Sequence, residues 1–171
     1  MESTSRYHDG LRDLTLEELN VKPNEKDWSI GQVVDHIITT NSAYYPVFDD
    51  VLNGQGSQSF IAKVPGMHKF LGNLIYKSVL DTNPKKIKTA PVFEPAKSEI
   101  ESDLWDRFDQ MQEKMQSYVQ SFSPGQLDII ISSPASPLVV YKVSRALDII
   151  CVHEKRHLNQ ALNLRESLLA K

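Results

Sequence analysis

The sequence predicts an all-α protein built as a four-helix bundle, and two observations carry this prediction. Apolar residues recur at the 3.6-residue spacing of an α-helix in three long segments and one weaker one. These segments are Ser5 to Asn20, Ile30 to Phe48, Ser98 to Phe122 and Leu138 to Lys171. The connections between them differ greatly in length, so we expect crossovers rather than a regular up-and-down bundle.

Composition narrows the class of protein further. A chain of 171 residues with 40% hydrophobic residues is long enough for one domain with a substantial core, and we expect residues 1–171 to form a single domain. The net charge of -3 gives no basic field for nucleic acid. Neither an apolar run of membrane-spanning length nor a signal-peptide pattern is present. The single cysteine, Cys151, excludes an internal disulfide, so we predict a cytoplasmic protein.

Two sequence patterns mark the starts of helices in the first third of the chain. Thr15 lies three residues before Glu18, and Ser29 three residues before Gln32, which is the spacing of a capping box. We therefore expect a short helix and a turn of another before Pro23, then a second long helix that starts after Ser29 with Trp28 as its hydrophobic anchor. Its apolar stripe runs without interruption to Phe48, with Asp35, Thr39, Ser42 and Asp49 on the opposite face.

The middle of the chain is less regular. The spacing from Met67 to Leu80 predicts a short extra helix in the long second connection, and Asn83 to Lys97 reads as a long surface connection. Ser98, three residues before Glu101, is expected to cap the third long helix. Residues 126–137 are expected to be irregular or briefly extended.

The last helix carries the most informative residues, His153 and His157. Four residues apart, they lie on one face of the helix, at the inner edge of its apolar arc. Two interpretations stay open for this pair: ligands that converge on one metal ion, or two half-buried, inert rings. The letters HEKRH also match the H-E-x-x-H helix of zinc proteases, but no His or Asp follows His157 as a third ligand. Cys151 lies on the other flank, and we interpret it as a buried, unreactive residue.

A third histidine, His36, falls at the border of the apolar stripe of the second long helix. By itself this position is typical of a surface histidine. It is also a position from which a side chain can point into a cleft between two helices.

Two motifs together carry a family resemblance. The pattern W-S-x-x-Q-x-x-x-H at residues 28–36 and the pattern H-E-x-R-H-x-x-Q at residues 153–160 resemble those of the DinB/YfiT-like metalloenzyme family, over about Leu11 to Leu164. The resemblance implies a four-helix bundle with up-down-down-up connectivity and a metal centre with His36, His153 and His157 as ligands. Characterised members are thiol-dependent transferases and isomerases that use low-molecular-weight thiols such as bacillithiol or mycothiol; many others have no known activity.

Three imidazoles leave at least one position on a divalent ion open for water or substrate. We therefore expect one transition-metal ion, zinc or nickel, that lowers the pKa of a bound thiol or water to near neutrality. The predicted activity is a thiol S-transferase or isomerase that takes a small-molecule electrophile and a low-molecular-weight thiol. Glu154 is a candidate base, although Lys155 and Arg165 offer it an ordinary salt bridge. Gln160 is a candidate for orienting a ligand histidine.

Two other classes of function stay open. One is a metal-dependent hydrolase that uses a bound water, and the other is a non-enzymatic helical bundle, such as a homodimer, whose histidines hold no catalytic metal. The mouth of a site at the histidines is expected to be lined by residues 83–97 or by residues 134–137.

Overall fold

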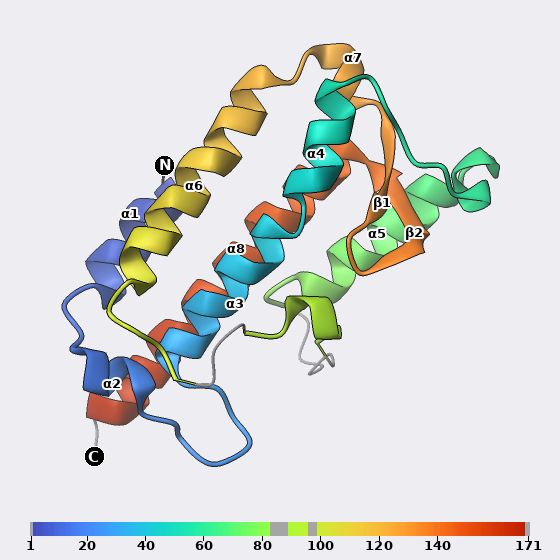
Figure 1. Cartoon of the computed structure of the whole chain (residues 1–171). Coiled ribbons are helices and arrows are strands. Elements are labelled where there is room, and N and C mark those ends of the chain that lie inside the picture. The colour runs from blue at the N-terminus through green and yellow to red at the C-terminus, as the bar shows by residue number, and fades with distance from the viewer. Residues whose placement is uncertain (1, 83–88, 96–98, 170–171) are drawn as a thin grey trace.

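The computed structural model describes residues 2–82, 89–95 and 99–169 of the chain. Four helices of the described part enclose the main core: α1 (Glu2–Leu11), α3 (Ile30–Ser42), α6 (Leu104–Ser121) and α8 (Val143–Leu169). Helix α3 packs against both α6 and α8, and α1 packs against α8. The ring of Tyr7 on α1 lies 4.9 Å from that of Phe108 on α6, which closes the group. Figure 1 shows α3 and α6 running in one direction and α1 and α8 in the other.

Both predicted capping boxes are confirmed. The Thr15 side chain accepts a hydrogen bond from the Glu18 backbone N–H at the start of α2 (Leu16–Asn20), and the Glu18 carboxylate accepts from the Thr15 N–H. Ser29 and Gln32 make the same reciprocal pair at the start of α3. Each box satisfies two backbone donors that a helix start leaves without partners, so these boundaries follow from local sequence.

The all-α prediction is wrong in one place. Strands β1 (Ile130–Ser133) and β2 (Ser136–Lys142) form an antiparallel hairpin, so the last helix begins at Val143 and not at Leu138. The most buried side chains of β2 belong to Val140 and Tyr141, which are 0% and 1% exposed. Consecutive strand residues point to opposite faces, so this end of β2 is buried on both. β-Branched and aromatic residues suit such a strand, and this outweighs the helical spacing at the start of the segment.

Two other helix boundaries differ from the prediction. The second long helix ends at Ser42, and a separate helix, α4 (Tyr45–Leu52), follows with Pro46 in its first turn. Proline has no backbone N–H to donate, so the helical hydrogen-bond ladder cannot continue through it. The third long helix begins at Leu104, after Asp103, and Ser98 of the predicted cap lies outside the described residues.

The second connection contains the predicted extra helix, α5 (Met67–Val79), which packs against β2 and α8. Figure 1 shows α5 and the hairpin together on the side of α8 away from α6. Two 3-10 turns, η1 (Phe60–Lys63) and η2 (Pro91–Phe93), lie before and after α5, and α7 (Pro124–Leu127) precedes the hairpin. Of the predicted connection Asn83 to Lys97, residues 83–88, 96 and 97 lie outside the described part.

The predicted polar face of α3 is wrong for Asp35, which is 0% exposed. Its carboxylate accepts a hydrogen bond of 2.6 Å from Arg107 of α6, so the ion pair lies inside the helix group.

Within the described residues, none of the helices combines the length and apolar character needed to cross a membrane.

Candidate metal centre

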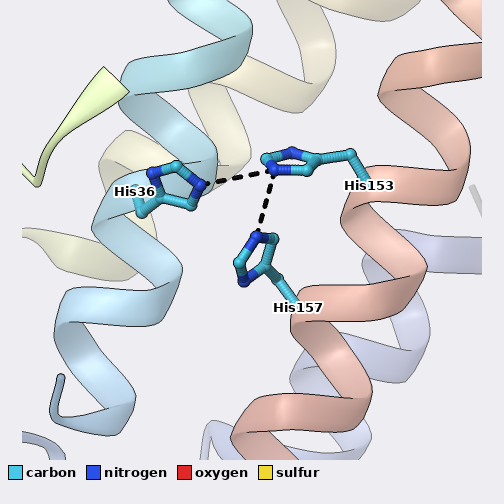
Figure 2. Close-up of side chains that lie close together, drawn as sticks. All are labelled: His36, His153 and His157. Atoms are coloured by element: carbon cyan, nitrogen blue, oxygen red, sulfur yellow. Dashed lines mark hydrogen bonds between the residues drawn. The ribbon is translucent and has the colours of Figure 1, made fainter. Parts of the chain in front are cut away.

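The structure brings His36, His153 and His157 together, with α3 supplying the first and α8 the other two (Figure 2). The Nε2 atom of His153 lies 3.4 Å from that of His36 and 3.0 Å from that of His157. The candidate ligand atoms of the three rings all lie within 4.8 Å of one another. The Nε2 atoms therefore converge on one point between the two helices.

The other ring nitrogens of two of these histidines bind to acceptors. His36 Nδ1 lies 2.5 Å from the backbone oxygen of Phe93, and His157 Nδ1 lies 2.9 Å from Oε1 of Gln160. A carbonyl oxygen only accepts, so each Nδ1 is the donor and carries the proton. In the neutral rings, Nε2 then presents a lone pair to the centre.

Burial keeps these imidazoles neutral. It lowers the pKa of His36 and lowers that of His153 well below the usual value, with the neighbouring rings adding to the shift at His153. The pKa of His157 is lowered to about 3, mainly because the ring is buried and also because His36 and the Arg156 cation lie nearby. The neutral, unprotonated form is the one that binds a metal ion.

This arrangement fits a divalent transition metal. Two nitrogens bound to one ion at about 2.0–2.1 Å and tetrahedral angles are roughly 3.3 Å apart, close to the separations found here. The buried Nδ1 of His153 has no hydrogen-bond partner, so its Nε2 either donates to a neighbouring ring or, with the proton on Nδ1, offers a third lone pair to a metal ion. The fourth donor position has no candidate in the cluster, since the described residues offer only these three side chains there. A three-nitrogen set of this kind is typical of a site that keeps a position open for substrate.

Comparison with known families places the whole chain in context. The model of the DinB superfamily matches residues 2–161. The chain belongs to the DinB superfamily. It is also similar to the uncharacterized protein YuaE of Bacillus subtilis (strain 168), with 24% identity over 159 residues that cover 92% of this chain and 90% of that protein. No solved structure gives a significant match. The family resemblance predicted from the two motifs is thus confirmed.

In this DinB superfamily member, the histidines lie in the wall of a cavity of about 860 Å³. Its lining includes Phe93 from the predicted connection 83–97 and Ala135 from the predicted segment 134–137, so both candidate segments contribute. Arg156 also lines the cavity and donates a hydrogen bond of 2.9 Å to the Leu80 carbonyl beyond the end of α5. A volume of this size is typical of sites for small organic ligands.

The two candidate supporting residues are placed differently. Gln160 lines the cavity and contacts His157, in the position expected of a residue that orients a ligand ring. Glu154 is buried and turned toward α3 and α6, where its carboxylate accepts hydrogen bonds from Asn41 at 2.6 Å and Gln112 at 3.2 Å. Glu154 is not among the residues that line the cavity. Arg165, which the sequence offered as a salt-bridge partner for Glu154, contacts Asp13 at 2.6 Å.

The expectation that Cys151 is buried is wrong, because its side chain is exposed. Partial burial of the thiol, followed by the carboxylates of Glu154 and Asp148, raises its pKa. A raised pKa disfavours the thiolate, and this agrees with the interpretation of Cys151 as unreactive.

Sequence reasoning missed several residues of this site. The Phe93 contact uses a backbone oxygen, which no side-chain pattern reveals. The ring of Trp28 lies 4.9 Å from that of His36, and both residues line the cavity. Tyr44 and Tyr141 also line it, although the sequence places them 97 residues apart. The membership of Tyr44 in the predicted apolar stripe that His36 borders was the available signal for Tyr44.

Proposed function

We propose that this protein is a metal-dependent transferase of the DinB/YfiT type, which joins a low-molecular-weight thiol to a small electrophile or isomerises one with its help. His36, His153 and His157 would hold one zinc or nickel ion. The helices α1, α3, α6 and α8 would be the four-helix bundle that the family resemblance implies. The observation that carries the proposal is the convergence of three histidine Nε2 atoms in the wall of a ligand-sized cavity.

When bound, the ion supplies Lewis acidity that brings the pKa of a thiol near neutrality. The protein residues do the rest. The Phe93 carbonyl and Gln160 hold the Nδ1 protons and so fix the orientation of two rings. The apolar side chains of Ile149 and Ile150 exclude water from a bound electrophile.

The first test is metal content. Protein purified without a histidine tag is expected to contain close to one equivalent of zinc or nickel by mass spectrometry. His36→Ala and His157→Ala are expected to lose most of it. His68→Ala is the matched control, since His68 lies on α5 outside the cluster and its replacement leaves metal content unchanged. Equal, substoichiometric metal in all four proteins would refute the proposal.

The second test separates transferase from hydrolase. Product analysis of a panel of small electrophiles, with and without added thiol, is expected to show thioether or isomerised product only when thiol is present. Hydrolysis that proceeds equally well without thiol would replace the transferase proposal with a metal-dependent hydrolase.

A further inference from the structure

A second polar cluster lies in the same cavity, at the hairpin. It consists of the hydroxyls of Tyr44, Ser133 and Tyr141, which we call the hydroxyl cluster. The oxygens of Tyr44 and Tyr141 are 2.7 Å apart, and Tyr141 also makes a side-chain hydrogen bond with Ser133. Tyr44 and Tyr141 are only 3% and 1% exposed, yet all three residues line the cavity. Buried polar groups in a ligand cavity need partners, and they select ligands that provide them.

A count of protons shows that the hydroxyl cluster has one to donate. Three hydroxyls carry three protons, and the two contacts among them use two, whichever way each hydrogen bond points. The Ser133 oxygen is itself an acceptor, for the backbone N–H of Ala135 at 3.2 Å. Burial raises the pKa of both phenols, so they stay protonated at neutral pH. The third proton has no acceptor among the described residues and is available to the cavity.

The backbone spacing of His36 and Tyr44 sets the scale of a ligand that reaches both points. Tyr44 follows His36 by eight residues, and the backbone between them stays helical, because Ala43 and Tyr44 both have right-handed helical dihedrals. At 1.5 Å per residue their Cα atoms are about 12 Å apart.

The walls of the cavity define the chemistry of the ligand. Apolar side chains of Ile75, Val139, Ile149 and Ile150 line it together with the two polar points. Within the described part, four charged residues line the cavity. Lys26 and Asp27 lie before α3, Asp81 lies after α5, and Arg156 lies in the middle of α8. None comes from the hairpin or from the junction of α3 and α4. The hydroxyl cluster therefore meets a neutral group more favourably than a charged one, which would be buried there without a counter-ion.

We propose that the cavity binds an elongated ligand with its reacting end at the histidines, an apolar middle, and a neutral carbonyl, such as an amide, that accepts the free proton of the hydroxyl cluster. This deepens the proposed function, on which it rests for the position of the reacting end. The hydroxyl cluster positions the ligand and takes no part in bond making.

The experiment uses three probes on the zinc-loaded protein: an unbranched alkanethiol long enough to span about 12 Å, its ω-amide analogue, and an alkanamide without a thiol. Affinities are measured by titration calorimetry. We expect the ω-amide thiol to bind about three- to tenfold more tightly than the alkanethiol, the effect of one neutral hydrogen bond. The triple variant Tyr44→Phe/Ser133→Ala/Tyr141→Phe, which carries none of the three protons, is expected to abolish this difference and leave the alkanethiol affinity unchanged.

Tyr76→Phe is the matched control, because it removes a phenol on α5 that does not line the cavity. It is expected to leave all three affinities unchanged. If the triple variant does not fold, Tyr44→Phe/Tyr141→Phe replaces it, because this double variant removes both phenolic protons and is expected to reduce the difference between the two thiols.

Equal affinities of the two thiols for the wild-type protein would overturn the inference. So would an equal loss for all probes in the triple variant, since that outcome makes the cluster purely structural, and so would failure of all three probes to bind. If both thiols fail to bind while the alkanamide binds to the wild-type protein and not to the triple variant, the inference stands and the thiol-dependent function is refuted.

Discussion

Gln160→Ala tests whether the ring orientation of His157 matters for metal binding. The substitution removes the acceptor 2.9 Å from His157 Nδ1 and leaves the ring free to turn. Loss of such a supporting hydrogen bond commonly lowers metal affinity by about 10- to 100-fold. Gln160 is only partly buried and lines the cavity, so water can take its place on Nδ1. We therefore expect the lower end of that range, about tenfold or 1.4 kcal/mol.

The assay is competition for zinc with a chromophoric chelator at fixed pH. Asn159→Ala is the matched control, because its amide donates to Asp81 at 2.7 Å and makes no contact with the three histidines. Gln160→Glu keeps an acceptor and is expected to retain at least the wild-type affinity. A Gln160→Ala affinity within twofold of wild type, together with loss of binding in His157→Ala, would show that Gln160 does not support the ligand.

Two further predictions concern stability and the free thiol. Asp35→Ala leaves the guanidinium of Arg107 without its buried partner, although Asp103 still contacts it at 3.2 Å. We therefore expect the free energy of unfolding in urea to fall by about 3 kcal/mol, the lower end for a broken buried pair. A fall below about 1 kcal/mol would contradict this. Cys151 is exposed but its pKa is raised, so less thiolate forms at a given pH. Iodoacetamide should alkylate it more slowly than free cysteine at mildly alkaline pH, and the two rates should approach each other as the pH rises; alkylation faster than that of free cysteine would show an activated thiol.

Local interactions explain the parts of the fold that sequence reasoning predicted well. The capping boxes at Thr15 and Ser29 join residues three apart, and the stacking of His153 above His157 follows from the helical period alone. The third histidine was expected from the resemblance of two motifs to those of the family. These features depend on residues close in sequence or on a pattern common to the family.

The errors have a different origin. The burial of Asp35 depends on Arg107, which lies 72 residues away on α6. Helical spacing shows on which face of its own helix such a residue lies, but not which neighbouring helix covers that face. The hairpin likewise depends on the burial of Tyr141. The end of α3 at Ser42 has a local cause instead, because Pro46 in the first turn of α4 was visible in the sequence and its effect was overlooked.

The sequence by itself determined that this chain is mostly helical, that two histidines share one face of its last helix, and that a third is available upstream. Only the tertiary structure decided that the three rings meet, that Phe93 and Gln160 hold two of them by their outer nitrogens, and that Tyr44 and Tyr141 share the same cavity. The physical reason is that backbone period and capping act within a few residues, whereas side chains from different elements meet only when helices pack.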